Sequence, residues 1–384
     1  MLTSDSRFQL TETRRHNRNL NHKEFAERAT TLASRPLALF IELTKNCNLK
    51  CPMCRSGETY SHEFNLDRRL FEQLADELFQ SALLVDLRGW GESTMLPHFA
   101  ETVDIALKYR AQLRLVTNGQ LNRVKIWEKL MAAHAIIAVS CDSADAELFR
   151  KLRGGGRLPA LKRTVSTLVR LRERYNAPDS NLELITVASG DNLPGLSGIV
   201  TMAADLGVKK VTVFPLQSIN SDPSHLHHHL AAAQAAYSSA ASRARAEGIE
   251  LRLGAAPDVN MAIPDKVKMH PCMHPWSYAY IDYAGRVGFC DHLIGNPVYT
   301  FGSLSKMSFE EIWNSEQWVS LRKSHVAGIL PDRFFPCRWC FKNRYVDFED
   351  RLHPDYAARI VATNTVEQVT SPLSGDPTPP LPWM

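Results

Sequence analysis

The sequence predicts an α/β protein. Its larger part is a partial (β/α)6, TIM-like barrel, and its smaller C-terminal part is a cysteine-rich domain. Apolar runs of strand length alternate with amphipathic helical segments from Pro36 to about Gln217, a pattern typical of parallel βα units. The first apolar run leads directly into a group of three cysteines. A second group, of four cysteines, lies beyond residue 268, outside the alternating pattern.

Six strands and the helices between them account for the barrel. The predicted strands are residues 37–43, 83–87, 113–117, 135–141, 181–187 and 210–215, and the predicted helices are residues 66–79, 98–109, 123–133, 159–175 and 194–206. A dinucleotide-binding sheet would carry G-x-G-x-x-G after its first strand, whereas this chain has the three cysteines there. Barrels place their active sites at the carboxyl ends of the strands, so we expect the cysteines to mark the active site.

The domain boundaries follow from these patterns. We expect an N-terminal helical extension over residues 1–35, with a helix near 19–33 that acts as a lid or a plug or packs on the outside. The barrel then covers 36–220, a helix and a linker cover 221–268, and the small cysteine-rich domain covers 269–345. Residues 346–384 form a tail that is rich in Pro and Ser from residue 370 and is expected to be disordered there.

Composition narrows the class of protein. The net charge of +4 is spread over 384 residues without a long basic run, which argues against nucleic acid as a partner. No apolar stretch approaches the ~20 residues that a membrane span needs, and the polar N-terminus does not resemble a signal peptide. We therefore expect a cytoplasmic protein. In such a reducing compartment the eight cysteines indicate metal binding or catalysis before disulfides.

The cysteine triad after the first predicted strand is Cys47, Cys51 and Cys54, spaced C-x-x-x-C-x-x-C. Three thiolates can hold three irons of a [4Fe–4S] cube, which normally has four cysteine ligands. The fourth iron would then be open to an amine and a carboxylate. Zinc is the alternative, but structural zinc sites usually pair two short knuckles, and this is a single loop of three cysteines.

Polar or glycine-rich turns follow the next three predicted strands. Arg88 to Glu92 follows the second strand, and its two glycines permit close backbone approach. Thr117-Asn118-Gly119 follows the third strand, and Ser140 to Ser143 follows the fourth. Each turn alone is weak, but their joint placement at one edge of a barrel indicates a site.

These motifs together resemble those of radical S-adenosylmethionine (SAM) enzymes. The resemblance implies that Met53 lies against the SAM adenine and that the Gly-Trp-Gly-Glu turn accepts from the SAM amino group. It implies that Ser140, Asp142 and Arg153 serve the SAM carboxylate and ribose, with Arg150 as a substitute for Arg153. Asn118 matches a common T-N-G turn of the family. The residues carried over as SAM-binding are Met53, Gly89, Trp90, Gly91, Glu92, Asn118, Ser140, Asp142 and Arg153.

The second cysteine set is Cys272, Cys290, Cys337 and Cys340. A hairpin is predicted over 278–282 and 286–289, and a helix over 308–323, with a capping box of Ser308 and Glu311. Four cysteines suit either zinc or a fully ligated cluster. The spacing from Cys272 through Gly285 to Cys290 resembles the opening of the SPASM extension of radical SAM enzymes. Because no cysteine follows Cys340, the set is most similar to the one-cluster "twitch" form, as in the butirosin-type dehydrogenases.

The resemblance spans about residues 36–345 and implies two [4Fe–4S] clusters, one that binds SAM and one auxiliary. It implies reductive cleavage of SAM to a 5′-deoxyadenosyl radical, with electrons from a flavodoxin- or ferredoxin-like donor. We expect the auxiliary cluster to take the second electron as a secondary alcohol of an aminocyclitol or sugar becomes a ketone, in natural-product biosynthesis. One alternative is maturation of a ribosomally made peptide, and another is a redox-neutral epimerase or dehydratase. Candidate pocket residues are Arg88, Trp276 and Tyr278.

Cys141 and a group of histidines are expected to take no part in the reaction. Cys141 alternates with Ser140 and Asp142 along its strand, so it should point outward into the core. An epimerase would need such a thiol as a hydrogen-atom donor. The histidines at 225 and 227–229 diverge on a helix and have no neighbouring carboxylate, so we expect a solvated patch and no metal site.

Overall fold

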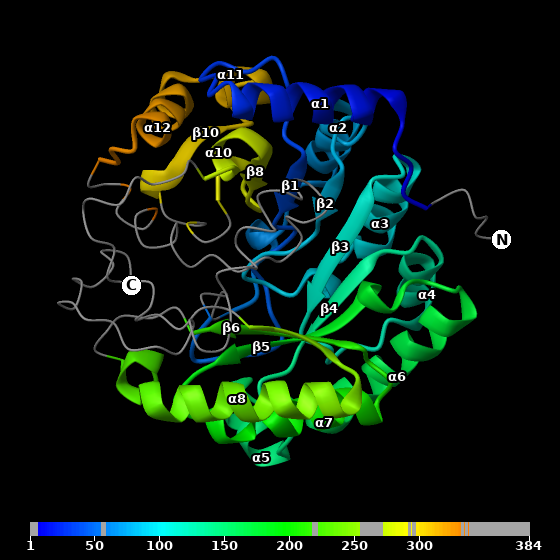
Figure 1. Ribbon diagram of the computed structural model, residues 1–384. Coiled ribbons are helices and arrows are strands. Elements are labelled where there is room, and N and C mark those ends of the chain that lie inside the picture. The colour runs from blue at the N-terminus through cyan, green and yellow to red at the C-terminus, as the bar shows by residue number, and fades with distance from the viewer. Residues whose placement is uncertain are drawn as a thin grey trace.

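A computed structural model of the chain describes residues 7–54, 59–216, 222–253, 272–290, 293, 297–331, 334 and 337. The strands form one curved sheet with helices on its outer side (Figure 1). The order in this ten-stranded sheet is β10-β9-β8-β1-β2-β3-β4-β5-β6-β7. The described chain therefore has a single sheet that runs from the barrel into the C-terminal region.

The barrel strands pair in parallel and in chain order. They are β1 (Ala38–Ile41), β2 (Leu84–Asp86), β3 (Gln112–Thr117), β4 (Ile136–Ser140), β5 (Leu182–Ala188), β6 (Lys210–Pro215) and β7 (Glu250–Leu253). The helices outside them are α2 (Arg68–Leu78), α3 (Phe99–Lys108), α4 (Val124–Ala132), α5 (Ala146–Leu152), α6 (Leu158–Arg174), α7 (Leu196–Asp205) and α8 (Leu230–Glu247). The six predicted strands and five predicted helices are confirmed to within about two residues. The short helix α5 was not predicted.

Alternation along the strands separates an apolar outer face from a polar lumen. Leu39, Ile41, Val85 and Leu115 are buried in the main core under the helices. Their neighbours point the other way and include Asp86, Arg114, Glu183 and Lys210, which bond to one another. Because these lumen side chains are charged, the barrel is stabilised mainly by burial of apolar side chains between the sheet and the helices.

The segment after β6 departs from the expected helix and linker. The 18-residue helix α8 packs against α7, and β7 pairs in parallel with β6 in the register Lys210↔Glu250. The strand β7 therefore forms part of the barrel sheet. Helix α8 thus completes the sixth βα unit, and β7 adds a seventh parallel strand.

The C-terminal region begins with α10 (His274–Ser277) and the hairpin of β8 (Tyr278–Ile281) and β9 (Arg286–Gly288). The predicted hairpin is confirmed, but its pairing with the barrel was not anticipated. β8 lies parallel to β1, with Ala38 opposite Tyr278 and Ile41 opposite Ile281. β10 (Thr300–Ser303) then pairs with β9.

Two helices follow β10 where one was predicted. They are α11 (Phe309–Trp313) and α12 (Glu316–Ala327), and Ser308 and Glu311 form the predicted capping box. The helix breaks because Ser315 starts a new N-cap, with its hydroxyl accepting from the Trp318 N–H. The remaining helical turns are 3-10 segments: η2 (His62–Phe64), η3 (Ser93–Met95), η4 (Asp179–Asn181), η5 (Leu193–Gly195), η6 (Leu226–His229) and η8 (Pro297–Tyr299).

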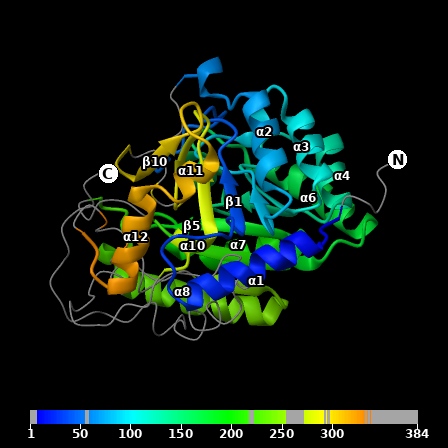
Figure 2. The ribbon, with the colours of Figure 1, turned by 90° about the horizontal axis from the view of Figure 1, so that it is seen from above.

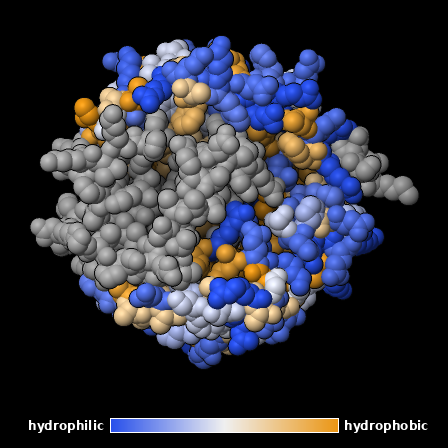
Figure 3. Space-filling model, viewed as in Figure 1, coloured by the Kyte–Doolittle hydropathy of each residue, from blue (hydrophilic) through white to orange (hydrophobic). Residues whose placement is uncertain are grey.

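The N-terminal helix α1 (Glu12–Ala26) starts seven residues before the predicted one. It begins at the Thr11 N-cap and ends before Arg28, whose φ of 59° is left-handed. The prediction of its bounds was wrong because the buried residues of this helix are polar, so no apolar period marks it. Its outer side is hydrophilic (Figure 3).

Helix α1 joins the barrel to the C-terminal region, and Figure 2 shows it running past β1 toward α12. Buried Arg14 donates to the carbonyl oxygens of Ala82, Phe79 and Tyr109 at 2.6–2.8 Å. Asn21 donates to the carbonyl of Trp276 at 2.7 Å and accepts from the Ser277 hydroxyl at 2.7 Å. The extension is therefore a packed outer helix, and these buried bonds fix it in place.

Three sequence expectations fall outside the described residues: the linker at 254–268, the ligand Cys340 and the tail beyond residue 345. Within the part that is described, no helix has both the length and the apolar character that crossing a bilayer requires.

Candidate active site

The triad loop leaves the carboxyl end of β1 and is held by side chains of its own neighbourhood. Asn46 donates to the carbonyl of Ser61 at 2.8 Å and accepts from the Ser61 N–H at 2.9 Å. The Thr44 hydroxyl donates to the Asn65 side chain at 2.7 Å. These bonds fix the start of the loop before the first cysteine is reached.

Glycines let two other segments approach the triad loop closely. A Cβ on Gly91 would lie 2.1 Å from the carbonyl oxygen of Thr44, and the next N–H, of Glu92, donates to the carbonyl of Asn46 at 2.8 Å. A Cβ on Gly154, where φ is +50°, would lie 2.0 Å from the carbonyl carbon of Lys50. The loop is thus clamped between the turn after β2 and the end of α5, and neither position has room for a side chain.

The three cysteines of the triad are half-buried free thiols. Asn118 donates from Nδ2 to Cys47 Sγ at 3.7 Å, and the Leu49 N–H donates to the same sulfur at 3.4 Å. Cys54 Sγ lies 3.4 Å from the carbonyl oxygen of Trp90. Burial raises the pKa of Cys47 to about 11, so iron binding would have to displace a proton from this thiol.

Glu92 is 2% exposed, and its carboxylate accepts hydrogen bonds from other residues of the protein. It accepts from the Thr94 and Thr117 hydroxyls at 2.6 and 2.8 Å and from the Asn118 N–H at 2.7 Å. Glu92 therefore ties the turn after β2 to the turn after β3. Its expected contact with the SAM amino group stays a prediction.

Asp142 and Arg153 form a buried pair at the end of β4. Arg153 donates to Asp142 Oδ2 at 3.0 Å, and Asp142 Oδ1 accepts from the Val187 N–H at 2.8 Å. Burial lowers the pKa of Arg153, but the charges of Asp142, Cys51 and Cys54 outweigh burial, and the net pKa is raised. Among the described residues no acceptor bonds to the buried Arg153 Nε.

The alternative to Arg153 lies at the surface of α5, and the choice between the two arginines stays a prediction. Arg150 has a 64% exposed side chain that pairs with Glu147 on the same helix. Ser140 is half-buried at the last position of β4, and Met53 is half-buried within the triad loop. The SAM roles of Ser140, Asp142, Asn118 and Met53 stay predictions, although the structure brings all four turns to one edge of the barrel.

The chemistry of the donor set fits a cluster with an open iron, whereas within the described residues the side chains are not gathered into a ready metal site. Three thiols of one loop are the ligand type that iron–sulfur clusters use. Arg153 adds a fixed positive charge beside two of them, and its Nε–H has no acceptor among the described residues. The glycines at 91 and 154 let the backbone of two other segments pack directly against the loop.

Three cysteines of the second set lie in the described chain. Cys272 precedes α10, Cys290 follows β9, and Cys337 lies beyond α12, and each side chain is half-buried. Cys290 and Cys337 pack against the core that contains Phe289, Phe301 and Phe334. Their role as ligands of an auxiliary cluster stays a prediction.

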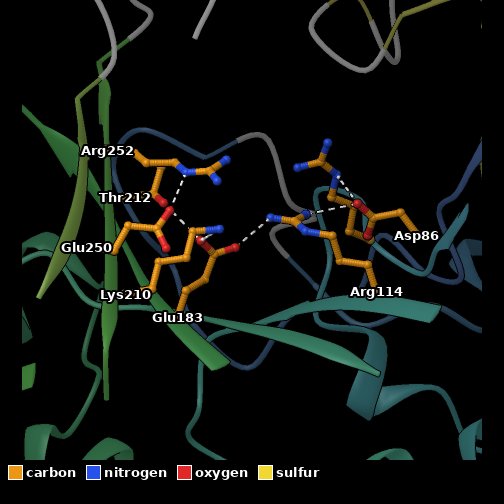
Figure 4. A network of polar contacts seen from close by, with 8 residues as sticks. Asp86, Arg114, Glu183, Lys210, Thr212, Glu250 and Arg252 are labelled. Atoms are coloured by element: carbon orange, nitrogen blue, oxygen red, sulfur yellow. Dashed lines mark hydrogen bonds and ion pairs between the residues drawn. The ribbon is translucent and has the colours of Figure 1, made fainter. Parts of the chain in front are cut away.

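A chain of charges crosses the lumen beside this edge (Figure 4). Arg114 bonds to Asp86 at 2.9 Å and to Glu183 at 3.2 Å, and Lys210 lies 3.0 Å from the other oxygen of Glu183. Arg114 reaches Glu183 past Ala138 of β4, which is opposite Glu183 in the register. Arg88, which stacks on Phe40 at 4.8 Å, pairs with Asp86 at the β2 end. The lumen can therefore meet polar or charged groups of a substrate.

Several sequence expectations can now be compared with the structure. Cys141 is fully buried in the core, as expected. Trp276 is also fully buried, with Nε1 bonded to the carbonyl of Ala29, so it packs and lines no pocket. Tyr278 is buried against Phe40. His225 is 3% exposed, which corrects the expectation of a fully solvated histidine patch.

Two residues at the site were missed from the sequence. Glu42, on the lumen side of β1, accepts from the Trp90 N–H at 2.7 Å. Gly154 packs on the triad loop, as described above. A lone carboxylate within an apolar strand and a run of three glycines were the available signals, but neither specifies its partner.

Comparison with known proteins agrees with this geometry. Residues 41–192 match the Radical SAM superfamily, and residues 272–341 match SPASM, an iron-sulfur cluster-binding domain. The chain therefore contains a radical SAM domain followed by a SPASM domain. These domains make SAM and [4Fe–4S] iron–sulfur clusters its cofactors, including auxiliary cluster binding in the SPASM domain.

Among individual relatives, the mycofactocin maturase MftC of Mycobacterium tuberculosis is 28% identical over 173 residues, which are 45% of this chain and 43% of that protein. The chain thus matches less than half the length of this relative. The AdoMet-dependent heme synthase of Methanosarcina barkeri is 26% identical over 76% of this chain and 86% of its own. The PqqA peptide cyclase of Gluconobacter oxydans is 22% identical over 81% and 84%.

Solved structures support the fold. Streptococcus suis SuiB bound to S-adenosylmethionine has a TM-score of 0.60 at 15% identity and covers 80% of this chain and 71% of its own. The structure of BtrN with AdoMet and 2-DOIA has a TM-score of 0.43, too low to support an interpretation of function. The expected resemblance to a butirosin-type dehydrogenase is therefore unconfirmed.

Proposed function

We propose that this chain is a radical SAM enzyme that modifies a peptide. The observation that carries the proposal is the similarity to the PqqA peptide cyclase, which runs through both domains and covers 81% of the chain. AlbA of Bacillus subtilis, named for biosynthesis of the bacteriocin subtilosin, adds a 31% match over 121 residues. This ranking reverses the expectation from sequence, in which peptide maturation was the alternative.

The proposed roles belong to residues of the triad loop and of the turns around it. Cys47, Cys51 and Cys54 would hold the SAM-binding cluster, and the turn at 89–92 would receive the SAM amino group. When bound, the cluster and SAM supply a 5′-deoxyadenosyl radical that removes a hydrogen atom from the substrate. Asp142 holds Arg153 in place. From this position the guanidinium would neutralise negative charge at the triad and bind the SAM carboxylate.

The C-terminal domain favours an oxidative outcome. β8 continues the barrel sheet beside β1, so the segment between Cys272 and Cys290 is rigidly fixed to the strand that leads into the triad. A fully ligated cluster there could accept the second electron from the substrate. This same observation supports oxidation of a secondary alcohol of an aminocyclitol or sugar as the second candidate. A flavodoxin- or ferredoxin-like protein would supply the first electron in either case.

The redox-neutral alternative is weaker. An epimerase needs a hydrogen-atom donor, and Cys141 is fully buried with its thiol directed to the Ser143 carbonyl at 3.4 Å. Burial raises the pKa of this thiol to about 12. A substrate radical in the lumen would not reach it without rearrangement of β4.

The test is anaerobic reconstitution of the wild type and of a variant with alanine at Cys47, Cys51 and Cys54. With four irons per cluster, the wild type should hold about eight irons and the variant about four. The variant should lose cleavage of SAM to 5′-deoxyadenosine. If the wild type instead holds about four irons plus zinc, the second cysteine set binds zinc and no auxiliary cluster. The chain would then lack an acceptor for the second electron, and the oxidative outcome would be excluded.

The substrate class is tested with the same wild-type preparation. Short peptides encoded beside the gene are incubated in parallel with aminocyclitols, and products are detected by mass spectrometry. We expect a mass change in a peptide that requires SAM and reductant. A ketone from an aminocyclitol, with no peptide altered, would make alcohol oxidation the function.

A further inference from the structure

Glu42 is a buried carboxyl group to which nothing in the proposed chemistry assigns a role. It follows β1 and is 2% exposed. Phe40, two residues earlier, belongs to the buried cluster on the lumen side of the sheet, whereas Leu39 and Ile41 belong to the outer core. Glu42 therefore points toward the lumen at the edge where the triad loop begins.

The contacts of Glu42 reach the SAM-binding turn. Its Oε1 accepts from the Trp90 N–H at 2.7 Å, and the carbonyl of the same Trp90 receives the Cys54 thiol at 3.4 Å. A Cβ on Gly89 would lie 2.2 Å from Cγ of Glu42. The Trp90 backbone is thus held at its N–H by the Glu42 carboxylate and lies beside a cysteine of the triad, and the absence of a side chain at Gly89 leaves room for Glu42.

Glu42 also reaches the SPASM domain. Its own N–H donates to the carbonyl of Ile281, the last residue of β8, at 2.8 Å. The backbone N–H of Tyr283 in the hairpin turn lies near enough to its carboxyl group to lower the pKa of that group. This one residue therefore bonds to backbone from both domains.

Charges surround this carboxyl group on both sides. Asp282 lies beside it, directly after β8, and is itself satisfied by Arg286 at 2.5 Å and by the N–H of Ala284 at 2.9 Å. Lys45 acts on it from the triad loop. Burial raises the pKa of Glu42 to about 7, with Asp282 acting in the same direction, and the Trp90 and Tyr283 N–H groups and Lys45 oppose the rise. A position that served packing alone would be filled at less cost by an apolar residue.

We propose that Glu42 is a positioning residue that sets the 89–92 turn against the triad and links it to the hairpin turn of the SPASM domain. The proposal rests on the proposed function, because it takes residues 89–92 as the SAM amino-group site. Loss of the carboxylate would let the Trp90 peptide rotate and would weaken SAM binding without removing a cluster ligand. It would also release the hairpin turn that follows β8.

The experiment compares Glu42→Ala and Glu42→Gln with wild type as reconstituted, cluster-loaded proteins. Three quantities are measured: iron per chain, the Kd for SAM, and the EPR spectrum of the reduced protein with and without SAM. Glu24→Gln is the matched control, because Glu24 is 8% exposed and also accepts backbone N–H groups, from Ala33 at 2.7 Å and Ser34 at 3.2 Å, but lies in the N-terminal helix.

We expect Glu42→Ala to keep its iron and to bind SAM about tenfold more weakly, as loss of a hydrogen bond to a charged group implies. Its EPR spectrum should lose the change that SAM induces in wild type. Glu42→Gln should recover part of the affinity, because its amide oxygen can still accept from Trp90 but its NH2 group cannot accept a hydrogen bond. Glu24→Gln should match wild type in SAM affinity and EPR spectrum.

Other outcomes separate the two hypotheses. SAM affinity within twofold of wild type in an iron-loaded Glu42→Ala protein would overturn the positioning role. If that variant fails to load iron, Glu42→Gln decides: wild-type affinity together with a wild-type EPR response would again reject the role. A wild-type protein that loads iron but binds no SAM would contradict the proposed function itself.

Discussion

At the scale of single residues, the site depends on side chains that act through one another. Both carboxylate oxygens of Asp142 accept hydrogen bonds from the protein. Oδ2 accepts from the Arg153 guanidinium at 3.0 Å, and Oδ1 accepts from the Val187 N–H at 2.8 Å. Glu92 likewise bonds to Thr94, Thr117 and Asn118. Both carboxylates were expected to contact SAM, and the structure shows them first as supports for the groups beside them.

Arg153 provides a residue-scale prediction. Arg153→Met removes a positive charge that acts on Cys51 and Cys54, and less positive charge near a cluster disfavours its reduced state. We expect a more negative reduction potential for the SAM-binding cluster and weaker SAM binding, measured by EPR-monitored redox titration and by Kd. Arg150→Met is the control, since Arg150 is on the same helix but is exposed and pairs with Glu147. Equal potentials in the two variants would count against the role of Arg153.

At the scale of elements, the end of α5 acts as a support for the triad loop. The Lys50 N–H donates to the carbonyl of Gly154 at 3.3 Å, and Gly154 leaves no space for a Cβ against Lys50. The next glycine, Gly155, has φ of +93°, but a Cβ added there would meet nothing within 4 Å beyond its chain neighbours. Substitutions at these two glycines can therefore distinguish a steric clash with the triad loop from backbone strain alone.

The element-scale prediction compares these two glycines. Both Gly154→Ala and Gly155→Ala carry a backbone penalty of about 1 kcal/mol for a left-handed conformation. Only Gly154→Ala also displaces the loop that carries Cys51. We expect iron content after reconstitution to fall in Gly154→Ala and to stay near wild type in Gly155→Ala. Equal losses in both would show that strain in the turn, and not contact with the triad loop, is responsible.

At the scale of the whole molecule, the radical SAM and SPASM domains are one structure. β8 pairs with β1 along four residues, and α1 contacts both the barrel and the C-terminal region. Trp313 donates to the carbonyl of Ser34 at 2.8 Å, and Arg322 donates to that of Thr30 at 3.1 Å. We therefore expect the described parts of the two domains to unfold together.

Asn21→Leu tests this cooperation. Asn21 is fully buried and bonds to Ser34, Trp276 and Ser277, so the variant removes the donor to the carbonyl of Trp276. We expect a loss of about 1–3 kcal/mol in the free energy of unfolding. Far-UV circular dichroism and tryptophan fluorescence should follow one shifted urea transition. Two separate transitions would show that the domains unfold independently, and exposed Asn19→Leu serves as the control.

The sequence by itself determined the features that depend on neighbouring residues. The spacing of Cys47, Cys51 and Cys54, the alternation of strands and helices, the hairpin around Gly285 and the capping box at Ser308 are local patterns, because each is specified by a few consecutive residues. The outward direction of Cys141 followed from strand alternation in the same way.

Tertiary structure decided the features that join distant segments. The pairing of β8 with β1 and of β7 with β6, the contact of Gly154 with Lys50, and the bond from Glu42 to Trp90 each link residues that are far apart in the chain. Such contacts depend on how the sheet closes and on which backbones then meet, and no local period encodes that. The sequence therefore predicts which residues would hold the cofactors, whereas only the fold shows which side chains and backbone groups support those residues.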